Sequence, residues 1–283
     1  MRLLRYGAPG RERPGMLDSQ GRLRDLSEHV TDLAGAMLLP AAIEHLRSLD
    51  PLRLPEVTDS PRIGPCVGAV GKIIGVGLNY KDHATESGMP IPKEPPLFLK
   101  PSSAIIGPND DVEIPLGSEK TDWEVELGVV IGNPGKYLRI EQALDHVAGY
   151  CIVNDVSERA WQLERGGQWD KGKGCDTFAP IGPWLVTPDE VGDPQELDLW
   201  LEVDGHRLQR GNTRTMIFNV AYLITYISQF MSLRSGDVIS TGTPPGVGLG
   251  QKPPKYLTAG QTMRLGITAL GVQQQRTVRA TPA

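Results

Sequence analysis

Two glutamates in the segment TDWEVELGVVIG could act together as metal ligands. Glu124 and Glu126 are two residues apart, so in a β-strand their side chains point to the same face. The run GVVIG that follows is apolar on both faces, which predicts a buried strand in which unpaired carboxylates would be unfavourable. A bound cation would remove that penalty. The alternative is an edge strand that carries two solvated glutamates.

A third carboxylate, Asp155, ends an apolar run in YCIVNDVSERAWQ, where a helical pattern begins. Arg159 and Gln162 follow it by four and seven residues, which predicts that all three side chains share one helix face. Ligation by carboxylate oxygens alone suits Mg²⁺, Mn²⁺ or Ca²⁺. The alternative makes Asp155 a helix N-cap and Arg159 its surface partner.

The segment DKGKGCDTFAPIGPW places Lys171, Lys173 and Asp176 in a Gly-rich loop that enters a strand. Loops on a rigid sheet commonly carry catalytic groups. A lysine beside a metal and a carbonyl substrate can stabilise an enolate or alkoxide. The alternative is a turn with solvated lysines.

His83 and Glu86 lie three residues apart in KDHATESGMPIPKEPP, so they are neighbours on one helical turn. Gly88 and the prolines after it end that turn. A carboxylate beside an imidazole orients the ring and raises its basicity, which is what a general base requires. A structural histidine is the alternative.

The segment DVISTGTPPGVGLGQ is predicted to be a strand followed by a rigid turn. Ser240, Thr241, Thr243 and the backbone N–H groups of this turn could bind a carboxylate. The segment lacks the GxxxxGK[ST] spacing of a P-loop, and GVGLNY lacks the third glycine of a dinucleotide fingerprint.

The elements that must position these groups are mostly strands. Apolar runs rich in β-branched residues, KIIGVGLN, VELGVVIG, VAGYCIVND, LDLWLEV and DVISTGT, predict buried strands. One long helix is predicted over residues 216–233, and shorter ones near residues 41–49, 141–146 and 155–164. We therefore expect an α+β fold made mainly of strands, with a small N-terminal β-rich domain and linker over residues 1–70 and a catalytic domain over residues 71–283.

The overall composition of the 283-residue chain excludes several classes of function. The net charge is −5 and the basic residues are scattered, so nucleic acid is not an expected partner. Three widely spaced cysteines predict neither a disulfide framework nor a metal clip. Because no signal peptide and no membrane span is apparent, we expect a cytoplasmic protein.

Taken in order, the His83 and Glu86 segment, FLKP, WEVELGVVIG, NDVSER, KGCDTFAPIGP and ISTGTPPGVG resemble the fumarylacetoacetate hydrolase superfamily from about residue 71 onward. This resemblance implies a mixed β-roll or β-sandwich catalytic domain of the fumarylacetoacetase C-terminal type. It also implies a homodimer or a higher homo-oligomer.

The resemblance assigns roles residue by residue. It places Mg²⁺ or Mn²⁺ on Glu124, Glu126 and Asp155, and catalysis on His83, Glu86 and Lys173. It implies that substrate is bound by Arg159, Gln162, Thr243 and Lys100, with Lys100 in a supporting role. One departure is Leu78, which stands where many relatives have an arginine, and this puts in doubt any substrate that needs a second charge there.

Within the superfamily, the chain resembles bacterial hydrolases of 2,4-diketo-3-deoxy-L-rhamnonate or L-fuconate, which implies cleavage of a 2-oxo acid to pyruvate and L-lactate. The alternatives are another acylpyruvate hydrolase, an oxaloacetate decarboxylase, an isomerase or a ureidoglycolate lyase using the same site. A non-enzymatic alternative is a calcium-stabilised binding module.

Overall fold

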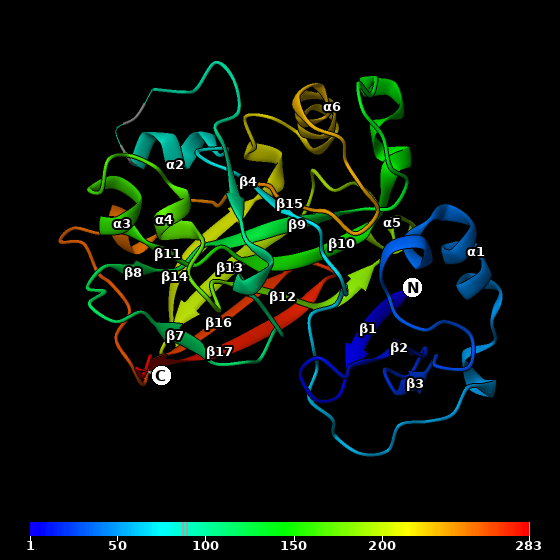
Figure 1. The fold of residues 1–283 in the computed structure, drawn as a ribbon. Helices are drawn as coiled ribbons and strands as arrows, with labels where there is room; N and C mark the ends of the chain where they lie inside the picture. The colour runs from blue at the N-terminus through cyan, green and yellow to red at the C-terminus, as the bar shows by residue number, and fades with distance from the viewer. Residues whose placement is uncertain (87, 89, 283) are drawn as a thin grey trace.

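The structure is a computed structural model that describes residues 1–86, 88 and 90–282. Within these residues, its largest sheet has the strand order β3-β2-β1-β12-β10-β9-β15-β4-β5, with β6 beside β12 (Figure 1). The strands of this sheet are β1 Arg2–Tyr6, β2 Arg13–Leu17, β3 Leu23–Asp25, β4 Ile73–Val76, β5 Leu97–Lys100, β6 Ile105–Ile106, β9 Val125–Ile131, β10 Val147–Asn154, β12 Ala179–Val186 and β15 Val238–Ser240. The β15–β4 and β12–β6 pairs are parallel, and the other pairs are antiparallel.

A second sheet has the order β14-β13-β16-β17-β7, and a short pair joins β11 to β8. These strands are β7 Val112–Ile114, β8 Thr121–Asp122, β11 Ser157–Glu158, β13 Asp198–Val203, β14 His206–Asn212, β16 Thr262–Ile267 and β17 Gly271–Arg279. Together with the first sheet and short helices, they confirm the predicted α+β class with a predominance of strands.

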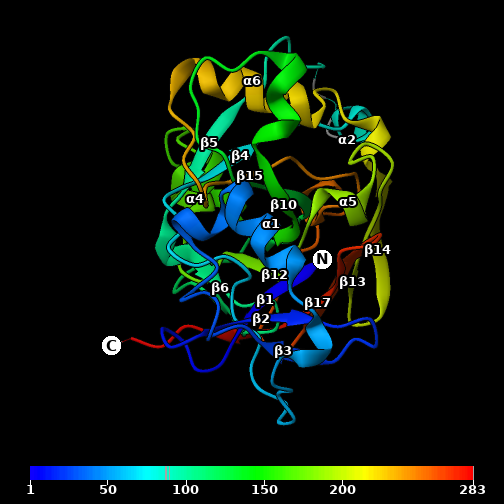
Figure 2. The ribbon, with the colours of Figure 1, turned by 90° about the vertical axis from the view of Figure 1, so that its right-hand side faces the viewer.

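The helices are short and lie around the sheets (Figures 1 and 2). The α-helices are α1 Pro40–Ser48, α2 Lys81–Glu86, α3 Arg159–Leu163, α4 Asp170–Lys173, α5 Pro188–Val191 and α6 Val220–Phe230. The 3-10 helices are η1 Gly35–Leu38, η2 Pro51–Arg53, η3 Ser102–Ala104, η4 Ile140–His146, η5 Thr213–Thr215 and η6 Gly248–Gly250. Among the helices that the structure describes, none is long and apolar enough to span a bilayer.

The helix predicted over residues 216–233 is shorter in the structure. It begins at Val220, where the Asn219 side chain accepts the Tyr222 N–H at 2.8 Å. The preceding residues are held extended, because Met216 forms a bridge with Tyr80, and the Asn79 side chain bonds both the N–H and the carbonyl of Phe218. The stretch over residues 155–164 is helical only from Arg159 to Leu163, and the stretch over 141–146 is a 3-10 helix.

Strands β9 and β10 are buried on both faces and contribute to two hydrophobic cores. In β9, Leu127 and Val129 pack into a core shared with α6 and the second sheet, whereas Val130 packs into a core shared with the N-terminal elements. This arrangement explains why both strands are continuously apolar in sequence.

The N-terminal strands extend the first sheet, because Leu3 of β1 pairs with Leu185 of β12. Figure 1 shows these elements (blue) at one side of the molecule and α2, α3 and α4 at the other. The division of the chain at about residue 70 stays a prediction.

Candidate active site

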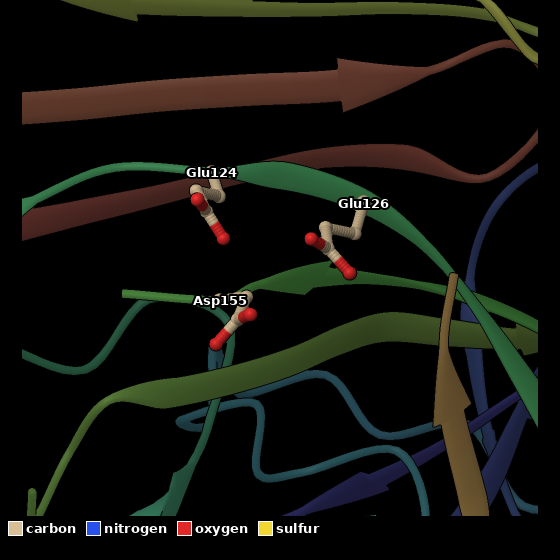
Figure 3. A group of neighbouring side chains, drawn as sticks. All are labelled: Glu124, Glu126 and Asp155. Carbon is tan, nitrogen blue, oxygen red and sulfur yellow. The ribbon is translucent and has the colours of Figure 1, made fainter. Parts of the chain in front are cut away.

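The pairing of β9 with β10 brings three carboxylates together. Val153 lies opposite Glu126, and the Asp155 N–H just beyond the strand donates to the Glu124 carbonyl at 2.9 Å. Glu124, Glu126 and Asp155 each offer a carboxylate oxygen, and these oxygens lie within 4.8 Å of one another (Figure 3). All three side chains are buried. The face shared by Glu124 and Glu126 is therefore an interior one, and the alternative of two solvated glutamates is wrong.

Three buried cations neutralise two of these carboxylates. Lys173 Nζ lies 2.6 Å from both Glu124 Oε2 and Asp155 Oδ2. Lys100 Nζ lies 2.5 Å from Asp155 Oδ1, and Arg159 Nη2 lies 2.6 Å from Glu124 Oε1. Although burial opposes the charge on Lys173, Asp155 and Glu124 outweigh burial and hold its pKa above the usual value. Burial acts against Glu124 as well, but Lys173 and Arg159 lower its pKa.

Glu126 is in a different environment. Its Oε2 accepts hydrogen bonds from the Ser240 hydroxyl at 2.6 Å and from the Gly242 N–H at 2.8 Å. Burial, followed by the negative charges of Asp155 and Glu124, raises the pKa of Glu126 well above its usual value. Among the described residues, Glu126 therefore has two uncharged hydrogen-bond donors and no bonded cation, so ionised Glu126 would need a positive charge from elsewhere. An oxygen-only donor set of this kind fits a hard divalent cation such as Mg²⁺ or Mn²⁺.

The predicted histidine and glutamate pair forms on α2. His83 Nδ1 lies 3.1 Å from Glu86 Oε2. The N–H of Gly246 points to the same carboxylate, at 3.0 and 3.1 Å from its two oxygens. These hydrogen bonds outweigh burial and lower the pKa of Glu86, so the carboxylate stays charged beside the imidazole. Sequence reasoning missed Gly246, although the turn GTPPGVG was recognised as a source of N–H donors.

One hollow of about 540 Å³ brings most of the predicted residues together. Its lining includes His83, Glu86, Glu124, Glu126, Arg159, Gln162, Lys173 and Thr243. Asp155 and Lys100 are buried and do not line the hollow. Asp155 is bonded to the lining residue Lys173, and Lys100 is bonded to Asp155. The Thr243 hydroxyl is already engaged, because it donates to the Val125 carbonyl at 2.9 Å and accepts from Gln209 at 2.7 Å.

A glycine brings Lys173 to the cluster. Lys173 ends α4, and a Cβ at the preceding Gly172 would overlap the backbone of Glu158 and Gln162. The absence of a side chain lets α4 pack against α3, so the ammonium group reaches the carboxylates. The other polar groups of this predicted loop, Lys171 and Asp176, are exposed and do not join the cluster.

The predicted helix face is only partly correct. Arg159 Nη1 donates to Gln162 Oε1 at 3.1 Å, but Asp155 lies before the helix, and Glu158 caps α3 by accepting the Trp161 N–H. Asp155 is therefore not the N-cap. The reason is that residues 157–158 pair with β8 as strand β11, which delays the start of the helix.

Sequence reasoning also missed Asp122, which is fully buried. Its carboxylate accepts from Arg159 Nε at 2.8 Å and from the Gly248 N–H at 2.6 Å. Asp122 thus orients Arg159 and ties the turn after β15 to the site. Its place in TDWEVEL, two residues before Glu124, was the available clue.

Comparison with known proteins agrees with this geometry. A family model described as the C-terminal region of fumarylacetoacetate (FAA) hydrolase matches residues 72–278. The chain belongs to the fumarylacetoacetate hydrolase family. It is 69% identical over 278 residues to a Burkholderia multivorans protein that is provisionally named a hydrolase, covering 98% of this chain and 99% of that protein.

Two solved structures of this family are similar over the whole chain. Fumarylacetoacetate hydrolase from Exiguobacterium antarcticum has a TM-score of 0.87 at 35% identity, covering 99% of this chain and 100% of that one. Maleylpyruvate hydrolase from Sphingobium sp. SYK-6, solved with manganese(II) and pyruvate, has a TM-score of 0.80 at 28% identity with the same coverage. The chain is thus an enzyme of this family.

Proposed function

We propose that the chain is a metal-dependent hydrolase that cleaves the C3–C4 bond of a 2,4-diketo acid to give pyruvate and a carboxylic acid. The observation that carries the proposal is the His83–Glu86 pair, which lines the same hollow as the acidic cluster. Hydrolysis needs both a base for water and an anchor for the 2-oxo acid. The similarity to a maleylpyruvate hydrolase solved with manganese(II) and pyruvate supports this assignment.

Glu124, Glu126 and Asp155 would hold the metal, Mg²⁺ or Mn²⁺, which polarises the 2-oxo group of the substrate when bound. His83, oriented by Glu86, removes a proton from water, and this water adds to the C4 carbonyl. The Lys173 ammonium group stabilises the resulting oxyanion. The C3–C4 bond then breaks, its electron pair stays with C3, and a proton delivered to C3 completes pyruvate. The oxygen from water stays in the carboxylate of the other product.

Within this class, we propose 2,4-diketo-3-deoxy-L-rhamnonate or the related L-fuconate as the substrate, with L-lactate as the second product. The support is the resemblance of the whole chain, including the segments MRLLRYGAPGRERPG and SEKTDWEVELGVVIG, to hydrolases of these compounds. We also propose that the enzyme works as a homo-oligomer in the cytoplasm and uses no nucleic-acid or membrane partner.

Turnover in ¹⁸O-water tests the reaction class. Hydrolysis places one heavy oxygen in the carboxylate of the released acid, whereas decarboxylation, isomerisation or lyase action on ureidoglycolate places none there by this route. The 2-oxo group of pyruvate exchanges with water by itself, so only the second product is diagnostic. His83→Ala is expected to abolish the labelled product while Mn²⁺ still binds. Wild-type turnover of oxaloacetate or ureidoglycolate alone would contradict the proposal.

A further inference from the structure

Two hollows of the molecule share one wall. The active-site hollow has a volume of about 540 Å³, and a second hollow has a volume of about 440 Å³. Phe98 and Trp169 line both of them, with ring centroids 5.9 Å apart and ring planes tilted by 51°. These two rings therefore form an aromatic partition between the hollows.

The aromatic partition packs against two glycines in and just after β4. A Cβ added at Gly75 of β4 would overlap the Phe98 ring, and one added at Gly77 would overlap the Trp169 ring. Both rings thus pack directly on backbone. On the active-site side, Lys173 Nζ lies 4.8 Å from the centre of the Phe98 ring, so the partition adjoins the group proposed to stabilise the C4 oxyanion.

The active-site hollow has a polar part and an apolar part. The polar part contains the carboxylate cluster, its cations and the His83–Glu86 pair. The remaining lining is largely apolar and includes Leu78, Leu163, Val247 and Leu249 in addition to the aromatic partition. Since the 2-oxo acid end needs the polar part, the group attached to C4 must lie against apolar side chains.

The charges around the hollow disfavour a second carboxylate in that group. Arg159 is already bonded to Asp122 and Glu124, and Lys173 is the group assigned to the C4 oxyanion. Among the described lining residues, the remaining lysine or arginine is Lys252, which is exposed. A carboxylate in the apolar part would therefore lose its hydration without gaining a buried cation.

We propose that this site takes 2-oxo acids whose tail is short and uncharged, and that Phe98 and Trp169 set the upper limit of the tail. The second hollow is the space that a longer tail would enter if the partition were opened. This inference rests on the proposed function only in placing the 2-oxo acid at the acidic cluster.

N-substituted oxamates provide the test, because they present a 2-oxo acid end and a chosen tail but are not cleaved as diketo acids. Binding to the Mn²⁺-loaded protein is measured by calorimetry for oxamate and its N-propyl, N-octyl and N-(carboxypropyl) derivatives. We expect the wild type to bind N-propyl oxamate about tenfold or more tightly than the N-octyl and carboxylate-tailed derivatives.

Trp169→Ala joins the two hollows, so it is expected to improve N-octyl oxamate binding by about tenfold or more and to leave oxamate itself unchanged. Trp169→Leu is a second variant with a smaller change of volume, and thermal melting verifies that each variant is folded. Gln168→Ala is the matched control, because Gln168 is exposed and lines only the second hollow. It is expected to preserve the wild-type order of affinities.

The outcomes separate the two proposals. If oxamate binds but neither Trp169 variant changes the preference for tail length, the partition does not set the limit. If the carboxylate-tailed derivative binds as tightly as N-propyl oxamate, the tail is not restricted to uncharged groups. If no oxamate binds, the 2-oxo acid site itself is wrong, and the inference about its tail falls with it.

Discussion

Lys100 Nζ lies 2.5 Å from Asp155 Oδ1, and both side chains are fully buried. Lys100 comes from the end of β5 and also donates to the Val156 carbonyl at 3.0 Å. Asp155 is therefore both a proposed metal ligand and the counter-ion of a buried ammonium group. Glu126, by contrast, accepts from two uncharged donors. Removing the charge of Asp155 should therefore destabilise the protein more than removing the charge of Glu126.

Replacing Glu126 or Asp155 by the matching amide separates metal binding from stability. Glu126→Gln is expected to abolish Mn²⁺ binding but to change the free energy of unfolding by about 1 kcal/mol or less, because the raised pKa of Glu126 already favours its neutral form. Asp155→Asn is expected to abolish binding and also to destabilise the protein by about 3 kcal/mol or more, since Lys100 loses its buried partner. Calorimetric titration with Mn²⁺ measures metal binding, and urea unfolding of the metal-free proteins measures stability.

Equal stability of the two amide variants would show that the Lys100–Asp155 ion pair does not stabilise the protein. Retention of full activity after treatment with EDTA, or in Glu126→Gln, would contradict the metal site itself. Restoration of activity in the stripped wild type by Mg²⁺ or Mn²⁺ is the positive control.

Removing the charge of Lys173 is expected to strengthen metal binding but to weaken catalysis. Its ammonium group bridges Glu124 and Asp155, so it competes with a cation for the same oxygens. Lys173→Met should therefore raise the affinity for Mn²⁺ by about tenfold or more, which corresponds to about 1.4 kcal/mol. The same variant should lower kcat by about 10²-fold, because the oxyanion loses its donor. A weaker Mn²⁺ affinity would show instead that Lys173 holds the carboxylates in place.

The sequence predicts the strands of the site well because their patterns are local. The two-residue spacing of Glu124 and Glu126 and the position of Asp155 after an apolar run are sufficient to expect three carboxylates near one another. The same local patterns predict β4, β9, β10, β13 and β15. The length of α6 was overestimated, because the contacts that hold Met216 and Phe218 extended come from residues 79–80, which are distant in sequence.

The partners of the carboxylates could not be derived from spacing. Lys100 and Asp155 are 55 residues apart, and Asp122 reaches Gly248 across 126 residues. Such contacts depend on how the strands are ordered in the sheet, which hydrophobic periodicity does not specify. The sequence assigned Lys100 only by its resemblance to a family, and it gave no indication that Gly246 holds Glu86.

The pairing of β1 with β12 predicts that the N-terminal strands contribute to the stability of the whole sheet. Leu3 is fully buried and lies opposite Leu185 and Met16. Leu3→Ala is expected to lower the free energy of unfolding by about 2–5 kcal/mol. The control Leu52→Ala changes an exposed leucine and is expected to have an effect within about 0.5 kcal/mol. Equal urea midpoints for the two variants would mean that β1 is not part of the stable sheet.

Glu86 offers the most direct test of the proposed base. Its carboxylate bonds both His83 and the Gly246 N–H, so it fixes the imidazole relative to the turn after β15. Glu86→Gln keeps the size of the side chain but removes the charge that orients and polarises the ring. We expect kcat to fall by about 10²-fold or more, with a smaller change in KM, because general-base catalysis is lost while binding of the 2-oxo acid remains.

Glu86→Asp is the matched control for this prediction, because it preserves the charge while shortening the side chain. It should retain more activity than Glu86→Gln if charge is what His83 requires. The pH profile separates this role from a structural one: the Gln variant should lose activity across the whole pH range, with Mn²⁺ affinity and melting temperature near those of the wild type. A change confined to KM would assign Glu86 to substrate binding, and a parallel loss of Mn²⁺ affinity would assign it to the architecture of the metal centre.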